Sequence, residues 1–163
     1  VIDDSAIALS AIEAVLEEAA DLRVVKKLAG LEDVDLDRAL ASADVVIVDM
    51  LMPGRSGLGA LDDLVARRPT IVVSDAAPDS TIAREAGARG GRGYVSKREL
   101  GAAPGRERLR RLVRRAAAGR RATGGGAPLV AIGGSTGARR AVRRDRGLDR
   151  RAPCARADRP RDA

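Results

Sequence analysis

The fold of this chain is decided by residues 44–57, which read DVVIVDMLMPGRSG. Four consecutive aliphatic residues, three of them valine, predict a short strand that is buried on both faces. Asp49 ends this strand, at the edge where a parallel sheet presents its ligand-binding groups. Pro53 and Gly57 favour a loop before the next helix. Asp49 is therefore either a loop cap or a reactive group, and the remainder of the chain has to decide between them.

The alternation of patterns around this stretch predicts an α/β fold. Short aliphatic strands are expected at residues 1–2, 24–25, 45–48, 71–73 and 93–97, and helices from residue 5 or 6 and at 35–43, 58–65, 81–86 and 106–118. Five strands alternating with helices predict a doubly wound, five-stranded parallel sheet. The first strand has two residues in this sequence, and we expect that its beginning is missing.

The composition restricts the sites that the chain can build. Its 163 residues suffice for one domain of about 100–150 residues and part of a second. Aromatic residues make up 1%, so the core must be aliphatic. There is no histidine, which excludes a Ser-His-Asp triad and a histidine-containing metal site made from this chain alone. The single cysteine, Cys154, fits a reducing cytoplasm, and no apolar run is long enough for membrane insertion.

The net charge of +7 is unevenly distributed. Residues 1–105 carry −6, residues 106–121 carry +7, and residues 138–163 carry +6. The basic helix could bind nucleic acid, but a solvated linker helix is favoured because there is no helix-turn-helix pattern and only one aromatic residue. We therefore expect no specific nucleic-acid partner. The tail has almost no apolar periodicity and is predicted to be disordered.

Four predicted strand ends carry polar side chains. Asp3 and Asp4, Asp49, Ser74 and Lys97 should meet at one edge of the sheet. Three neighbouring carboxylates repel one another unless a cation lies among them, and oxygen ligands suit Mg²⁺. Asp49 would then be the nucleophile for a phosphoryl group, with Lys97 and the Ser74 hydroxyl on its oxygens. A loop aspartate, a strand-ending serine and a solvated surface lysine are the plainer alternatives.

These residues resemble a known family. The order and approximate spacing of Asp3-Asp4, Asp49, Met52-Pro53, Gly57, Ser74, Tyr94 and Lys97 are similar to the response-regulator receiver domain. The resemblance covers about residues 1–120 and implies a flavodoxin-like fold. It also implies that a histidine kinase phosphorylates Asp49 and that Ser74 and Tyr94 form a switch pair. For Tyr94, an ordinary half-buried strand residue is the alternative. The loop at 87–93 looks a few residues longer than in the family.

A second motif lies further along the chain. Residues 129–137, LVAIGGSTG, resemble the start of the chemotaxis protein-glutamate methylesterase domain, in which Ser135 would be the nucleophile. A short-chain dehydrogenase phosphate loop begins similarly, and the receiver in front favours the esterase. The resulting division is a receiver at 1–120, a linker at 121–127, the beginning of an esterase-like domain at 128–137, and a tail at 138–163. The arginine-rich tail suggests a slipped reading frame.

The leading interpretation is a chemotaxis response regulator of the methylesterase type. Its implied partners are a histidine kinase and methylated chemoreceptors. Because an esterase serine needs an activating base and the chain has no histidine, we expect this chain to lack esterase activity. The alternative is a non-enzymatic receiver module that signals by phosphorylation-dependent protein contacts.

Overall fold

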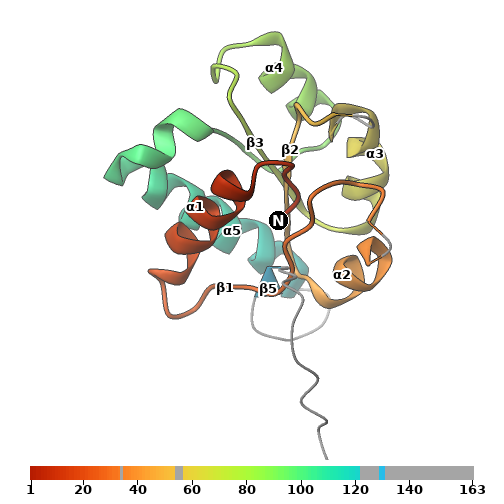
Figure 1. Ribbon diagram of the computed structural model, residues 1–163, viewed down its shortest axis with the longest axis horizontal. Coiled ribbons are helices and arrows are strands. Elements are labelled where there is room, and N and C mark those ends of the chain that lie inside the picture. The colour runs from red at the N-terminus through yellow and green to blue at the C-terminus, as the bar shows by residue number, and fades with distance from the viewer. Residues whose placement is uncertain (34, 54–56, 122–128, 131–163) are drawn as a thin grey trace, which may run out of the picture.

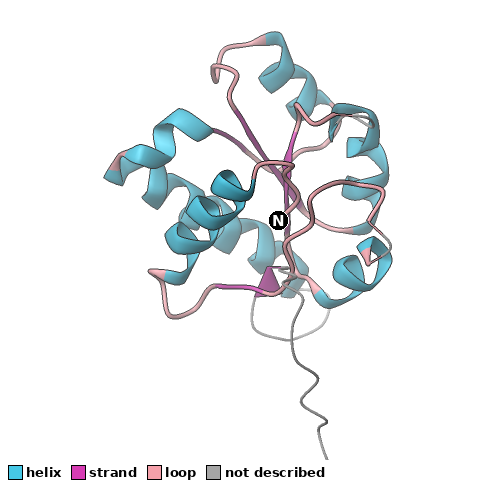
Figure 2. Cartoon of the chain, viewed as in Figure 1, coloured by secondary structure: helices cyan, strands magenta, loops and turns pink. Residues whose placement is uncertain are grey.

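The computed structural model describes residues 1–33, 35–53, 57–121 and 129–130 (Figures 1 and 2). Ser135, nearly all of the predicted linker and esterase start, and the predicted tail lie outside the described residues. The helices are α1 (Ala6–Glu17), α2 (Leu36–Ser42), α3 (Gly57–Arg67), α4 (Thr81–Ala88), the 3₁₀ helix η1 (Lys97–Gly101) and α5 (Ala103–Arg121). The strands are β1 (Arg23–Val24), β2 (Val46–Asp49), β3 (Thr70–Ser74), β4 (Tyr94–Ser96) and β5 (Leu129–Val130).

The sheet is parallel, as the sequence predicts. A continuous ladder joins β2, β3 and β4, with Asp49 opposite Val73 and Ser74 opposite Ser96. Ile2 forms parallel bridges to Val48 on one side and to Leu28 on the other. The spatial order is therefore the Leu28 segment, the Ile2 segment, β2, β3 and β4, which is the flavodoxin-like order.

The segments around Leu28 and Ile2 are less regular than predicted. The Ile2 segment is held by backbone hydrogen bonds on both sides, including Ile2 N to Ile47 O at 2.8 Å and Asp3 N to Leu28 O at 3.0 Å. Only three residues, 1–3, take part, so single bridges replace a ladder. Instead of lining up with the Ile2 segment, β1 pairs in parallel with β5.

Two aliphatic cores cover the two faces of the sheet. Along β2, Ile47 packs on the face covered by α1 and α5, and its neighbours Val46 and Val48 pack on the face covered by α2, α3 and α4. Figure 1 shows the two groups of helices on opposite sides of the strands. Burial of consecutive residues on both faces explains why the β2 sequence is uninterrupted by polar residues.

The basic helix differs from its prediction. The apolar face of α5 is buried in the core through Leu109, Val113, Ala116 and Ala117. Its arginines find acidic partners on the α1 side: Arg110 lies 2.5 Å from Glu18, and Arg114 lies 2.9 Å from Asp21. The expected solvated linker helix is therefore packed on the core of the α/β domain, and Arg110 and Arg114 are paired with acidic residues beside it.

Two boundaries also differ. The fourth helix was expected at residues 81–86, closed by Gly87, but α4 continues to Ala88, and the left-handed residue is Gly90 with φ of 89°. The last strand was expected to include Lys97, but β4 ends at Ser96 and Lys97 begins η1. Within the described parts of the chain, no helix is long and apolar enough to cross a membrane.

Candidate functional site

The polar residues predicted at the strand ends meet at one edge of the sheet. Asp3 follows the Ile2 segment, Asp49 ends β2, Ser74 ends β3, and Lys97 follows β4. Asp3, Asp49 and Ser74 are almost fully buried. The parallel topology places these residues together although up to 94 positions separate them in sequence, because every strand ends on the same side.

Lys97 connects two of the carboxylates. Its Nζ lies 2.8 Å from Asp3 Oδ2 and 2.9 Å from Asp49 Oδ2, and it donates a hydrogen bond to the latter. Burial alone would lower the pKa of Lys97, but its contacts with Asp3 and Asp49 outweigh burial and raise the pKa above its ordinary value. Lys97 is therefore a cation over the neutral pH range, and a solvated surface lysine does not describe it.

The Asp3 carboxylate is buried and only partly hydrogen-bonded. Its Oδ1 accepts a hydrogen bond from Ser5 N at 2.9 Å, while Oδ2 is buried and receives no well-directed hydrogen bond despite its proximity to Lys97. Burial raises the pKa of Asp3, Lys97 and the Ser5 amide oppose this rise, and the Asp49 carboxylate adds to it. Lys97 and the Ser5 amide therefore do not fully stabilise the ionised form of Asp3, and a further cation would stabilise it.

The carboxylates fit a hard divalent cation. Oxygen atoms of Asp3, Asp4 and Asp49 lie within 4.8 Å of one another, and Asp4 is exposed to solvent. Lys97 supplies one positive charge against three negative ones. Two buried carboxylates, one exposed carboxylate and the poorly satisfied Asp3 oxygen are a donor set that suits Mg²⁺, which retains several of its waters in protein sites.

Ser74 has a free hydroxyl at the same edge. The side chain is fully buried, and its Oγ has no hydrogen-bond partner among the described residues. A buried hydroxyl without a partner costs free energy, so such groups usually serve a bound species. Ser74 lies one position beyond Val73, which pairs with Asp49, so it extends past the aspartate toward the open edge.

Tyr94 is tied to the loop that follows β3. The side chain is half-buried, and its hydroxyl donates a hydrogen bond to Ala76 O at 2.8 Å. This bond links β4 to the segment directly after Ser74. The described contacts therefore connect the two residues of the predicted switch pair through two positions of backbone.

Two further residues support the site: Gly57, which the sequence indicates only as a loop residue and part of the family pattern, and Glu99, which was not among the predicted site residues. A Cβ atom on Gly57 would lie 1.9 Å from the backbone oxygen of Asp49, so the start of α3 packs directly on the backbone that carries this carboxylate. Glu99 Oε2 accepts a hydrogen bond from Ser96 N at 2.9 Å, which fixes the turn that presents Lys97. The S-x-x-E pattern at 96–99 is a recognisable helix-start signal. No local pattern reveals the Gly57 contact.

The comparisons with known proteins concern the fold and the family of the chain. No curated protein matches the chain significantly. The response regulator domain of Thermotoga maritima CheB is 24% identical, with a TM-score of 0.59 over 72% of this chain and 92% of that chain. A receiver domain protein from Clostridium thermocellum is also 24% identical, with a TM-score of 0.57 over 74% and 94%. At this level of identity the likeness concerns the fold.

A family model gives the assignment. The model for the response regulator receiver domain matches residues 1–104, which is more than half of the chain. Receiver domains are the phosphorylation-dependent modules of two-component signalling, and the acidic edge of the sheet lies within the matched residues. The chain therefore belongs to the response regulator receiver domain family.

Proposed function

We propose that this chain receives a phosphoryl group on Asp49. The observation that supports this most directly is the setting of that carboxylate: it is 3% exposed, at a strand end, paired with Lys97 and adjacent to two further carboxylates. A mere loop cap would need none of these neighbours. Asp49 Oδ1 does accept a hydrogen bond from Leu51 N at 3.2 Å, but this leaves its remaining lone pairs available.

The proposed donor is the phosphohistidine of a histidine kinase. A carboxylate oxygen of Asp49 attacks phosphorus, an O–P bond forms, and the N–P bond breaks. The imidazole leaves with the electron pair and takes a proton from solvent. Lys97 would contact an oxygen of the transferred group, because its ammonium lies 2.9 Å from the attacking carboxylate.

We further propose that Asp3, Asp4 and Asp49 hold Mg²⁺. When bound, this ion would supply positive charge to the phosphoryl oxygens during transfer. The role of the chain itself is positioning: Ser5 N orients the Asp3 carboxylate, and the Ile2 segment holds it next to β2. The Ser74 hydroxyl would donate a hydrogen bond to a phosphoryl oxygen. Tyr94 would respond to this contact, because its hydroxyl is hydrogen-bonded to Ala76 O in the same loop.

Phosphorylation by a small donor tests the proposal. Incubation with acetyl phosphate and Mg²⁺ should add one phosphoryl group to the chain, observed as the corresponding mass increase of the intact protein. Hydroxylamine should reverse the modification, because it cleaves acyl phosphates. Absence of a Mg²⁺-dependent increase would contradict the proposal.

Replacing Lys97 by methionine should have opposite effects on phosphorylation and on Mg²⁺ binding. The methionine retains the aliphatic stem but removes the ammonium that contacts the phosphoryl group, so the phosphorylation rate should fall by about 10²-fold or more. Affinity for Mg²⁺ should rise, since the lysine no longer competes for Asp3 and Asp49. Arg98→Met, at the exposed neighbouring position, is the matched control. Rates that fall equally in both variants would contradict a specific role for Lys97.

Mg²⁺ should stabilise the fold at neutral pH and lose this effect in acid. The pKa of Asp3 is raised by burial, so protonation of Asp3 begins at a higher pH than for an ordinary aspartate, whose value is 3.8. The pKa of Asp3 is higher in the folded protein than in the unfolded chain. At a pH above the folded-state pKa, ionised Asp3 therefore lowers the stability of the fold, and bound Mg²⁺ offsets this loss. The increase in Tm caused by Mg²⁺ should therefore decline while the pH is still above 3.8.

Thermal unfolding with and without Mg²⁺ across this pH range measures the effect. Asp3→Asn should remove most of the Mg²⁺-dependent increase in Tm, whereas Asp79→Asn, at an exposed position in the β3–α4 loop, should leave it unchanged. An increase in Tm that persists in Asp3→Asn would show that Mg²⁺ binds elsewhere.

We also propose a chemotaxis methylesterase as the protein type. The support is the similarity of residues 129–137 to the start of that domain, with Ser135 at the nucleophile position. The proposed partners are methylated chemoreceptors, and the proposed location is the cytoplasm. Since the chain contains no histidine to activate Ser135, it should release no methanol from methylated receptor above background. Turnover would contradict this expectation.

The second candidate is a receiver that acts through protein contacts alone. The buried Ser74 hydroxyl and the Tyr94 link would then change a protein-binding surface without an attached enzyme. The coding sequence that flanks this chain discriminates between the candidates. Histidine and aspartate codons in an esterase context favour the first.

A further inference from the structure

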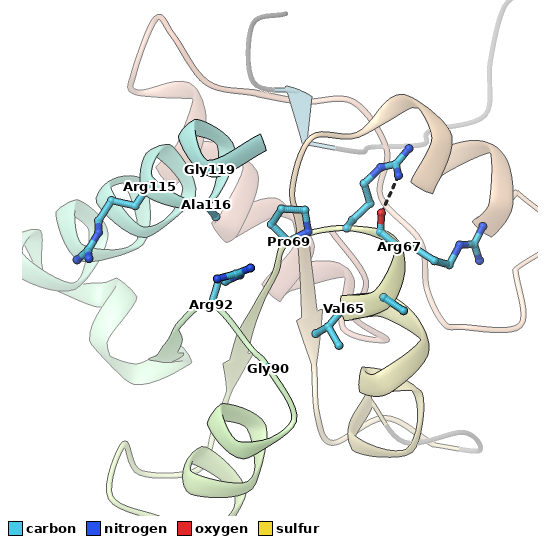
Figure 3. Close-up of a pocket in the computed structure, with 10 residues that line it drawn as sticks. Val65, Arg67, Pro69, Gly90, Arg92, Arg115, Ala116 and Gly119 are labelled. Carbon is cyan, nitrogen blue, oxygen red and sulfur yellow. Dashed lines mark hydrogen bonds between the residues drawn. The ribbon is translucent and has the colours of Figure 1, made fainter. Parts of the chain in front are cut away.

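A large basic pocket lies at the opposite end of the sheet from the carboxylates (Figure 3). Its volume is about 700 Å³, which is in the range of small-molecule sites. The lining comes from the end of α3, the residues just before β3, the segment before β4 and the last turns of α5, and it includes Arg67, Arg68, Arg92 and Arg115. Pro69 directly precedes β3, whose far end carries Ser74, so roughly 15 Å of strand separates the two sites.

The charged residues that line this pocket are all positive. Its lining holds four arginines and no carboxylate. Two of the arginines have structural explanations. Arg67 forms an ion pair with Asp37 at 2.7 Å, and Arg68 donates to the backbone oxygens of Ala43 and Ala41 at 2.9 and 3.3 Å. Both also lie at the end of α3, where cations are favoured by the helix dipole.

Arg92 and Arg115 lack such explanations. Both are exposed, and neither side chain has an ion pair or hydrogen bond to any other described residue. Arg92 follows α4 by several positions and Arg115 lies more than one turn before the end of α5, so neither is placed as a helix cap. Figure 3 shows the Arg92 guanidinium between Ala116 on α5 and Pro69, in the middle of the pocket, whereas the Arg115 side chain extends from α5 away from Arg92.

Two glycines, Gly90 and Gly119, belong to the lining of the pocket. Gly90 has φ of 89°, a conformation that other residues rarely adopt, and a Cβ on Gly119 would meet no atom within 4 Å. Val65, Pro69 and Ala116 provide an apolar lining beneath the charges. The volume exceeds that of a single phosphate, and the arginines come from different elements: the end of α3, the segment before β4, and α5. A ligand with several linked anionic groups matches this arrangement better than a single ion.

We propose that this pocket binds a small oligophosphate, with Arg92 as its principal ligand and the exposed Arg115 side chain turning toward the bound phosphates. Guanidinium groups make paired hydrogen bonds to phosphate oxygens, which suits such a ligand. The free ion and the phosphate chain of a nucleoside triphosphate share this chemistry. The proposal does not depend on phosphorylation of Asp49, because none of the four carboxylate-site strand ends contributes to the pocket.

Calorimetric titration of the full chain with sodium tripolyphosphate tests the proposal. Mg²⁺ is omitted and a chelator is present, so that the carboxylate site is not involved. We expect saturable 1:1 binding that weakens as salt increases. The double variant R92A/R115A should bind at least about tenfold more weakly, since two charge-assisted contacts are lost. The double variant R23A/R111A removes two exposed arginines outside the pocket and should bind like the wild type.

A third variant separates pocket shape from charge. Gly119→Leu keeps every arginine and lies on a helix where leucine is favoured, but its side chain would occupy the open space at Gly119. It should weaken binding while leaving Tm unchanged or higher. Asp49→Asn should bind tripolyphosphate normally even if it cannot be phosphorylated, so the two proposals fail or succeed separately.

The comparison ligands complete the test. Adenosine triphosphate binding more tightly than tripolyphosphate would identify a nucleotide as the source of the phosphate chain, and equal affinity would identify the free oligophosphate. Three outcomes would overturn the proposal: no saturable binding of tripolyphosphate, equal losses in the two double variants, or a duplex oligonucleotide binding tightly when tripolyphosphate does not.

Discussion

Asp49→Asn is expected to eliminate Mg²⁺-dependent phosphorylation of this chain while leaving it folded. Asparagine has the same shape and can still accept the hydrogen bond from Leu51 N, but an amide is too weak a nucleophile to take up phosphorus. Lys97 retains its contact with Asp3, so the side chain of the lysine remains compensated. The expected loss is complete within the detection limit of an intact-mass assay with acetyl phosphate.

The same variant should lose its response to beryllofluoride, which mimics the acyl phosphate. Asp79→Asn serves as the control because it removes an exposed acidic group of equal charge in the β3–α4 loop. Circular dichroism should give cooperative unfolding for both variants. If Asp49→Asn were phosphorylated as the wild type is, with the modification mapped elsewhere, the assignment of Asp49 would be wrong.

Gly57→Ala is expected to produce a large loss of stability from a single added methyl group. A Cβ at this position would lie 1.9 Å from Asp49 O and 2.9 Å from Asp49 C. Both atoms belong to the backbone, so relief requires α3 to move away from β2 by more than 1 Å, on the order of a van der Waals overlap. We expect a decrease of about 2 kcal/mol or more in the free energy of unfolding.

Gly87→Ala is the matched control with the opposite sign. Gly87 lies within α4, and a Cβ there would meet nothing within 4 Å. Alanine should stabilise the helix by up to about 1 kcal/mol. Urea denaturation measures both variants. Since Gly57→Ala displaces the backbone of Asp49, its phosphorylation should also slow, whereas Gly87→Ala should be phosphorylated normally. Equal stabilities of the two variants would contradict the close contact.

The part of the fold that could be predicted from sequence is the part that local pattern encodes. The strand at Val46–Asp49 is visible because it is apolar on both faces, and the cap at Ser5 is visible because its hydroxyl satisfies Ala8 N at 3.2 Å. The meeting of Asp49 and Lys97 follows from one topological rule, that parallel strands end on the same side.

The remaining features depend on contacts between distant residues. The basic helix was interpreted as a linker because its charge dominates its composition. Its apolar face packs on a core made by distant residues, and its arginines pair with Glu18 and Asp21, about 90 positions earlier. The Gly57 contact and the basic pocket have the same character, since each is made by elements that become neighbours only in the folded chain.

The aliphatic core has a practical consequence. The sequence contains one tyrosine and neither tryptophan nor phenylalanine, so a single phenol dominates the near-ultraviolet absorption and intrinsic fluorescence of the whole chain. That phenol is Tyr94, and its hydroxyl is bound to Ala76 O in the loop after β3. The molecule thus contains a native optical probe at one defined position, and its spectrum can be followed in solution without any label.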